Sequence, residues 1–153
     1  MTEREQVKPE RPRDELGRPL PWGSQSRLAL LNYDAMSIEE NHRLAREYFN
    51  EGKFFQAHEA WEGAWRKAQG TPDEEFYKGL AQIGAGYTHY RRENAHGART
   101  LLRRGLTRIR EYGPEYAGLD VEGLARAAED AAELIELAEE KGRRLPEIRF
   151  PRI

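Results

Sequence analysis

Apolar residues recur at intervals of three and four along most of this chain, which is the spacing of one face of an α-helix. The pattern predicts about five helices, over residues 37–51, 54–69, 71–92, 98–112 and 120–141. No segment alternates apolar and polar residues in the way a half-buried strand does. We therefore expect an all-α fold in which these helices form a compact bundle.

Capping residues mark where three of the predicted helices begin. Ser37 and Glu40 form a Ser-x-x-Glu capping box at the start of the first helix. Thr71 followed by Pro72 predicts the N-cap and the first helical residue of the third helix. Asp120 is the predicted cap of the fifth helix. These local signals place the helix boundaries.

Two of the helices share a spacing of small and large residues. The two copies, 41 residues apart, read Ala57-x3-Trp61-x2-Ala64 and Ala98-x3-Leu102-x2-Gly105. Tetratricopeptide repeats carry such a spacing in their second helix, with a period of about 34 residues. The sequence therefore predicts two tetratricopeptide-like antiparallel hairpins plus a closing helix. The alternative is that any antiparallel helix pair needs small residues where the helices cross.

Composition separates this helical body from the two ends of the chain. Residues 1–36 are charged, contain prolines and offer little to bury, which predicts a mostly disordered or strap-like N-terminal tail. Residues 37–141 form the predicted helical domain. Residues 142–153 contain two prolines and predict an extended C-terminal arm.

Overall composition excludes several classes of protein. The chain has 153 residues and no cysteine, which predicts one domain without disulfides, thiol catalysis or cysteine-ligated zinc. The formal net charge of −2 gives no general attraction to nucleic acid or to an anionic membrane. There is no apolar run of about 18 residues, so we expect no membrane partner and a cytoplasmic protein.

The candidate chemistry lies on the second and third helices. His58 and Glu62 are one helical turn apart at the edge of an apolar arc, beside Trp65. Glu59 and Arg66 lie further round the same helix, towards solvent. On the third helix, Gln82 and His89 border the apolar face. If the two helices are neighbours, His58, Glu62, Gln82 and His89 converge on one polar pocket.

These residues also carry a resemblance to a known family. The run His58-Glu59-x-x-Glu62-x-x-Trp65-Arg66, after a Gly-x-Phe-Phe entry, resembles the helical proteins grouped as domain of unknown function 309. A second block resembles the same family and reads Gly79-Leu80-x-Gln82, then His89, then Asn94-x-x-Gly97-Ala98-x3-Leu102. The resemblance covers about residues 37–110. It implies a compact multihelical fold with a polar cluster at these positions, and it implies no activity.

Three interpretations of the cluster stay open. The polar side chains could satisfy one another in a buried hydrogen-bond network that fixes the helix register. They could instead line a non-catalytic pocket for a small ligand or a peptide. The alternative from another class is a small hydrolase or metal-binding protein that uses His58, Glu62 and His89. The spacing matches no established metal motif, so we expect no resident metal and no cofactor, and the catalytic residues are unknown.

Arginines crowd the third and fourth helices, and acidic residues crowd the fifth. Such an arginine cluster would suit a phosphate or RNA, but the acidic helix that follows carries the opposite charge. We expect the two sets to pair with each other within the fold or between subunits, so a nucleic-acid partner is not expected and a homo-oligomer stays open.

Overall fold

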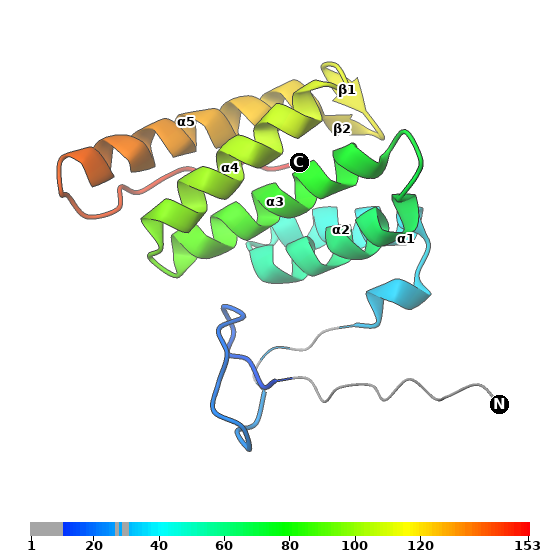
Figure 1. The fold of residues 1–153 in the computed structure, drawn as a ribbon, viewed down its shortest axis with the longest axis horizontal. Helices are drawn as coiled ribbons and strands as arrows, with labels where there is room; N and C mark the ends of the chain where they lie inside the picture. Colours follow the sequence, from blue (N-terminus) through cyan, green and yellow to red (C-terminus); the bar gives the residue numbers. More distant parts are fainter. Residues whose placement is uncertain (1–10, 27, 29–30) are drawn as a thin grey trace. The chain divides into compact units, whose positions relative to one another are not determined.

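In the computed structural model of this chain, which describes residues 11–26, 28 and 31–153, each α-helix packs mainly on the next one in the sequence. The helices are α1 (Ile38–Asn50), α2 (Phe54–Ala68), α3 (Glu74–Arg91), α4 (Ala95–Arg110) and α5 (Val121–Glu140). Figure 1 shows α3 in the centre, with α1 and α2 on one side and α4 and α5 on the other. The predicted all-α class is confirmed.

Two of the three predicted caps are confirmed, and one is wrong. The Ser37 hydroxyl accepts a hydrogen bond from the Glu40 amide, and Asp120 accepts one from Gly123. Thr71 does not cap α3, which begins at Glu74 after Asp73. The Thr71 hydroxyl instead donates to the Ala68 carbonyl at 2.6 Å. It also accepts a hydrogen bond from the Asp73 amide at 3.3 Å, so the hydroxyl links the end of α2 to the residue before α3 and bonds to no amide within α3.

The start of α4 also differs from the prediction. The sequence placed a corner up to Gly97, whereas α4 already begins at Ala95. Asn94 is the cap, and its side-chain oxygen accepts a hydrogen bond from the Gly97 amide at 3.1 Å. Asparagine at this position satisfies one of the free amides of the first turn.

The core lies between the helices and is built around α3. Its largest fully buried side chains include Trp61, Tyr87, Phe49, Phe76 and Leu80. The predicted apolar faces of the second and third helices are therefore the buried faces. Among the described residues, no helix is both long and apolar enough to cross a membrane.

A short β-hairpin that the sequence did not predict joins α4 to α5. Strand β1 (Glu115–Tyr116) pairs antiparallel with β2 (Leu119–Asp120). The two turn residues, Ala117 and Gly118, have φ values of 50° and 74°, as two-residue hairpin turns require. Strands of two residues are too short to show an alternating pattern, which is why periodicity could not predict them.

Ion pairs join α4 to α5, as expected for part of the arginine set. The pairs are Arg99–Glu139, Arg103–Glu136 and Arg110–Glu129. The Arg103 guanidinium makes two hydrogen bonds of 2.9 Å to the Glu136 carboxylate. These arginines are therefore occupied by acidic partners.

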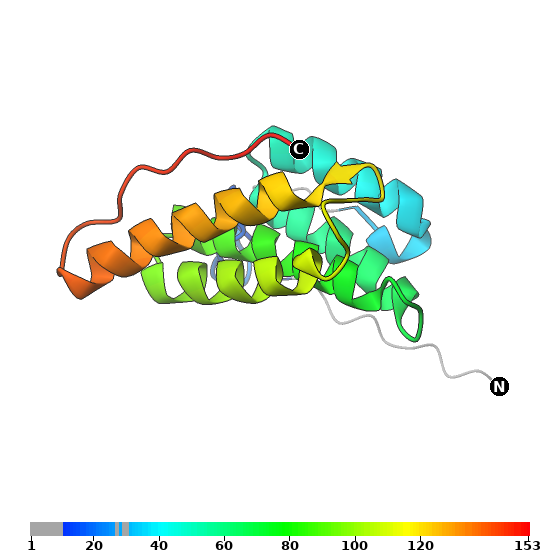
Figure 2. The same cartoon turned by 90° about the horizontal axis from the view of Figure 1, so that it is seen from above.

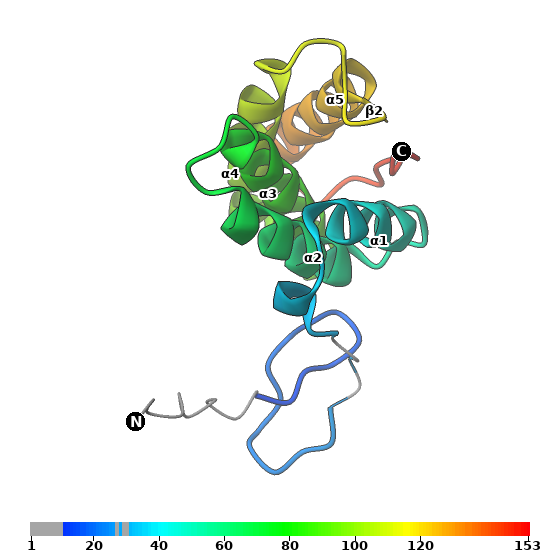
Figure 3. The same ribbon diagram turned by 90° about the vertical axis from the view of Figure 1, so that its right-hand side faces the viewer.

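Residues 143–153 form no helix or strand and run back along α5 towards α1 (Figure 2). Figure 3, a view from the side, shows the last residues of the chain between α5 and α1. Within the predicted tail, just before Met36, Tyr33–Ala35 forms a turn of 3₁₀-helix beside α2. The arm and this turn both belong to the same compact unit as the five helices.

Part of the predicted N-terminal tail has local order that we did not expect. Asp14 accepts hydrogen bonds from the amides of Leu16 and Arg18 and pairs with the Arg18 guanidinium at 2.7 Å. These bonds hold residues 12–20 in a turn, closed by the Leu20 amide on the Pro12 carbonyl. Residues 1–10, which fall within the same expectation of disorder, lie outside the described residues.

Candidate functional site

His58 lies on α2 where that helix faces α3, and both of its ring nitrogens meet acceptors. Nε2 is 3.1 Å from a Glu62 carboxylate oxygen, and a Glu59 oxygen is 3.7 Å away. Nδ1 is 2.8 Å from the Ala81 carbonyl oxygen of α3. Only the doubly protonated imidazolium donates to both acceptors at once. The geometry therefore favours a charged His58 that joins α2 to α3.

Arg66 extends this arrangement along α2 and beyond it. Its guanidinium is 3.0 Å from the second Glu62 oxygen and, on its other side, 3.0 Å from Asp34. Asp34 belongs to the 3₁₀ turn that precedes α1. A chain of alternating charges therefore runs from Asp34 through Arg66 and Glu62 to His58, and it ties that turn to α2 and α3.

The pKa values of the central pair move in opposite directions. Burial lowers the pKa of His58, but its hydrogen bonds to Glu62 and Ala81 and the nearby carboxylates outweigh burial and raise it above 6.5. The hydrogen bond from His58 lowers the pKa of Glu62 below 4.5 against the opposing effect of burial, and Arg66 lowers it further. Each partner therefore stabilises the charged form of the other.

The structure does not bring Gln82 and His89 into this network. The Gln82 side-chain oxygen accepts a hydrogen bond from Arg108 of α4 at 3.0 Å. His89 lies beside Asn94 at the start of α4, with Nδ1 3.0 Å from the Asn94 amide nitrogen. Burial lowers the pKa of His89, and the positive charges of Arg92 and His58 lower it further. Both residues lie on the side of α3 that meets α4.

Trp65 borders the cluster but is not bonded to it. The Lys78 ammonium lies 5.6 Å from the centre of the indole ring. Its indole N–H is buried and has no hydrogen-bond partner among the described residues. The half-buried indole therefore packs as a wall between α2 and α3, next to the ion pairs of Glu62 and Arg66.

The His58–Glu62 pair makes a testable prediction about pH. The pKa of His58 is raised in the folded state. Its contribution to the free energy of unfolding is therefore complete below about pH 6.5 and is lost as the pH rises through the folded-state pKa. The pKa of Glu62 is lowered in the folded state. Its contribution to the free energy of unfolding is therefore complete above about pH 4.5 and is lost as the pH falls through the folded-state pKa. In a double-mutant cycle of His58→Gln and Glu62→Gln, urea titrations should give a coupling free energy on the order of 1.5 kcal/mol in this window.

A matched control comes from Arg43 and Glu47 on α1, which have the same i, i+4 spacing at 3.0 Å. Their side chains are 63% and 54% exposed, so we expect little coupling between them. The coupling of His58 and Glu62 should fade at about pH 9, whereas that of the control pair should not change there. A His58–Glu62 coupling that is the same at both pH values would contradict the charged-pair assignment.

Sequence reasoning missed a second histidine, His42 on α1. Its Nδ1 accepts a hydrogen bond from the Trp61 indole at 3.0 Å, and its Nε2 donates to the Ala117 carbonyl at 3.1 Å. Burial lowers the pKa of His42, and Arg46 adds to this effect. The neutral ring therefore links the core to the β-hairpin. Its spacing with Ala45 and Phe49, on the buried face of α1, was the signal that could have identified it.

His42 also forms part of the wall of a pocket of about 670 Å³ between α1, the start of α3 and the hairpin. The residues lining it are Glu39, His42, Arg43, Arg46, Glu47 and Asn50 of α1, Asp73 and Tyr77, Tyr116 and Ala117 of the hairpin, and Ile153. None of the residues predicted for the ligand site lines it. This pocket depends on segments distant in the sequence, so helical spacing alone could not predict it.

Two donor groups in this pocket have no acceptor. The Arg46 guanidinium, on a half-buried residue, makes no ion pair or hydrogen bond with the described residues. Tyr77 is only 5% exposed, and its hydroxyl likewise has no hydrogen-bond partner among them. Burial raises the pKa of Tyr77 to about 12, and the charge of Asp73 contributes to the shift, so the hydroxyl keeps its proton at neutral pH. Both groups are available to a ligand.

Comparison with known proteins gave one result. No curated protein and no solved structure matches the chain significantly. Residues 42–101, from α1 into α4, match the family model of a domain of unknown function, DUF309. The matched range includes the first motif block and the second block up to residue 101, and it supports the family that these motifs resemble. The chain is therefore similar to DUF309 domains over residues 42–101.

Proposed function

We propose that this domain is a non-catalytic binding module, and that its ligand enters the pocket between α1, α3 and the β-hairpin. The observation that carries the proposal is the pair of donors without acceptors, Arg46 and the Tyr77 hydroxyl. Both groups line a pocket open to solvent, and a ligand that supplies an anionic acceptor there would form a charge-assisted hydrogen bond with Arg46. In the His58 cluster the corresponding groups are already paired.

The charges of the pocket limit the kind of ligand. Two arginines, Arg43 and Arg46, face three acidic residues, Glu39, Glu47 and Asp73. A multiply charged anion such as a phosphate would meet repulsion from the acidic side. A small molecule with one carboxylate, and with an apolar or cationic part beside the tyrosine rings, fits both sides. We therefore propose a small zwitterion or monocarboxylate as the ligand.

The test is an NMR titration of the ¹⁵N-labelled chain with simple carboxylates and with free amino acids. We expect a bound ligand to shift the Arg46 side-chain signal, and we expect Arg46→Gln to weaken binding by about tenfold or more, as for loss of a charge-assisted hydrogen bond. Tyr77→Phe removes only the hydroxyl and should also weaken binding while leaving the free energy of unfolding nearly unchanged.

Arg43→Gln is the matched control, because Arg43 lines the same pocket but is already paired with Glu47. It should weaken binding much less than Arg46→Gln does. Equal effects of the two substitutions, or no ligand that shifts the Arg46 signal, would refute the assignment of this pocket.

For the His58 cluster we propose a structural role, with a metal ion as the second candidate. One atom each of His58, Glu59 and Glu62 lies within 4.8 Å of the others, and the Ala81 carbonyl orients the ring as it would a metal ligand. An ion would have to replace the Nε2 proton and compete with Arg66 for Glu62. A stoichiometric ion retained by the purified chain and lost in Glu59→Gln would support this candidate over the structural role.

The tetratricopeptide-like character of the two hairpins belongs to the same proposal. Packing of each helix on the next, with buried small residues at the crossings, supports it. In such stacks the first helices of successive hairpins line one common surface. Here those helices would be α1 and α3, and residues of α1 and Tyr77 of α3 line the proposed pocket.

A further inference from the structure

The C-terminal arm is held against the helical body by bonds to its main chain. At the end of α1, the Asn50 side-chain nitrogen donates to the Ile153 carbonyl at 2.7 Å. The Asn50 oxygen accepts from the Ile153 amide at 2.8 Å. Because both bonds involve the backbone, they hold an extended segment without reading its side chains.

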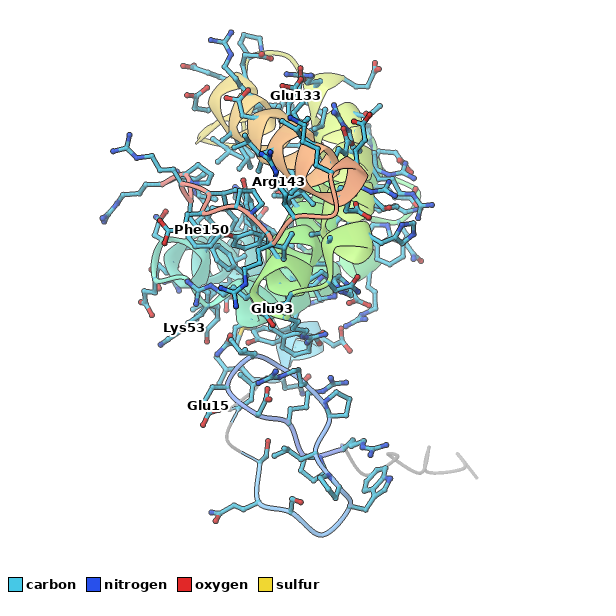
Figure 4. The ribbon with its side chains drawn as sticks, turned by 90° about the vertical axis from the view of Figure 1, so that its left-hand side faces the viewer. Glu15, Lys53, Glu93, Glu133, Arg143 and Phe150 are labelled. Atoms are coloured by element: carbon cyan, nitrogen blue, oxygen red, sulfur yellow. The ribbon has the colours of Figure 1, made fainter. Side chains whose placement is uncertain are left out.

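An aromatic seat on α2 and α3 holds Phe150 of this arm (Figure 4). The Phe150 ring centre is 4.8 Å from that of Phe54, 5.6 Å from that of Tyr87 and 5.8 Å from that of Tyr90. The Arg91 guanidinium lies 5.1 Å from Phe150 and 5.0 Å from Phe54. Aromatic and cation–π contacts of this kind select an aromatic side chain.

The prolines of the arm match the seat in another way. The Tyr90 hydroxyl donates to the Pro146 carbonyl. Proline lacks an amide proton and favours an extended backbone, so Pro146 and Pro151 leave no donor unsatisfied and keep the arm straight. The groove therefore suits an extended segment in which an aromatic residue is followed by proline, as Phe150 is followed by Pro151.

The arm does not fill this groove completely. A gap of about 460 Å³ remains between residues 148–152 and α5, beside Asp130 and Leu134. Beneath Phe150, the Tyr87 hydroxyl is fully buried without a hydrogen-bond partner among the described residues. An occupant that filled the gap and accepted a hydrogen bond from Tyr87 would bind better than the arm does.

From these contacts we propose that the groove is a peptide-binding site and that the arm is its internal occupant. The ligand is an extended segment of a partner protein that carries an aromatic residue followed by proline. The arm competes with this segment at the high effective concentration of a tethered group. The partner segment therefore binds only when the arm leaves the groove, so the arm lowers the apparent affinity of the chain for that segment.

The experiment uses a fluorescein-labelled synthetic peptide with the sequence of residues 145–153 and the full chain carrying Phe150→Ala. This substitution weakens the tethered arm and leaves the seat intact. Fluorescence anisotropy should show that the Phe150→Ala chain binds the peptide at least about tenfold more tightly than the wild-type chain does. A peptide with alanine in place of phenylalanine should not bind.

Two further variants locate the binding. Asn50→Ala added to Phe150→Ala removes the main-chain bonds and should weaken peptide binding by about tenfold. Tyr77→Phe in the same background alters the other end of the pocket, which shares Asn50 and Ile153 with the groove, and should leave peptide binding unchanged. A folded Phe150→Ala chain that fails to bind the peptide, or that binds the alanine peptide equally well, overturns the proposal.

If Phe150→Ala does not fold, hydrogen exchange of the wild-type chain gives the decision. The Ile153 amide, bonded to Asn50, should exchange much faster than the amides of α3, and an excess of the free peptide should speed it further. Exchange of Ile153 only through global unfolding, unaffected by the peptide, would show that the arm is a permanent part of the fold.

Discussion

Trp61→Ala should lower the free energy of unfolding by about 3–5 kcal/mol, which would unfold a domain of ordinary stability. Trp61 is fully buried, and its ring lies 5.9 Å from that of Phe49. Truncation to alanine leaves a cavity between α1 and α2. It also leaves Nδ1 of His42 without its donor, and an unpaired buried acceptor adds to the loss. Urea titration followed by circular dichroism measures the effect.

Two controls separate the causes of this loss. Trp61→Phe keeps an aromatic ring but removes the indole N–H, so its smaller loss reports on the hydrogen bond to His42. Trp65→Ala removes a half-buried indole one turn further along α2 and should cost clearly less than Trp61→Ala. If the two alanine variants unfold at the same urea concentration, Trp61 is not the centre of this core.

Helix boundaries were predictable where a single local interaction decides them. Ser37 and Asp120 bond to amides three residues later, so their roles depend only on their own helix. Thr71 shows the limit, because its hydroxyl joins the end of α2 to the Asp73 amide and α3 begins later, at Glu74. Local residue types do not show where in such a connection the second helix begins. The two-residue strands and their turn were missed for a different reason, since they are shorter than any detectable period.

In the candidate site, too, only contacts within one helix could be predicted from the sequence. His58 and Glu62 are one turn apart on one helix, so their pairing follows from spacing alone. The convergence with Gln82 and His89 required knowing which side of α3 meets α2. That side carries Ala81, which bonds His58, whereas Gln82 and His89 meet α4.

The pocket and the groove could not be inferred from helical periodicity. Arg46 and Tyr77 come together only because the hairpin closes one side and Ile153 the other. Both closing segments are irregular or very short. Their positions depend on long-range contacts, such as that between His42 and Ala117, for which an isolated sequence gives no spacing rule.

The close approach of α3 and α4 depends on glycine. A Cβ atom at Gly105 would lie 2.6 Å from the Gly79 carbonyl oxygen and 2.6 Å from a side-chain carbon of Ile83. Real Cβ contacts are not this short, and the oxygen belongs to a helix backbone that cannot rotate away. Alanine at this position therefore forces the two helices apart.

Gly105→Ala should consequently destabilise the domain by about 2–3 kcal/mol, even though alanine favours a helix by about 1 kcal/mol over glycine. Gly84→Ala is the matched comparison, because its Cβ would lie 3.1–3.3 Å from the backbone nitrogen, Cα and Cβ of His58, which is a milder overlap than at Gly105. Gly84→Ala should lower the free energy of unfolding much less, because the higher helix propensity of alanine offsets most of the strain. Urea titrations in which Gly105→Ala equals or exceeds the wild-type stability would show that α3 and α4 do not meet at this glycine.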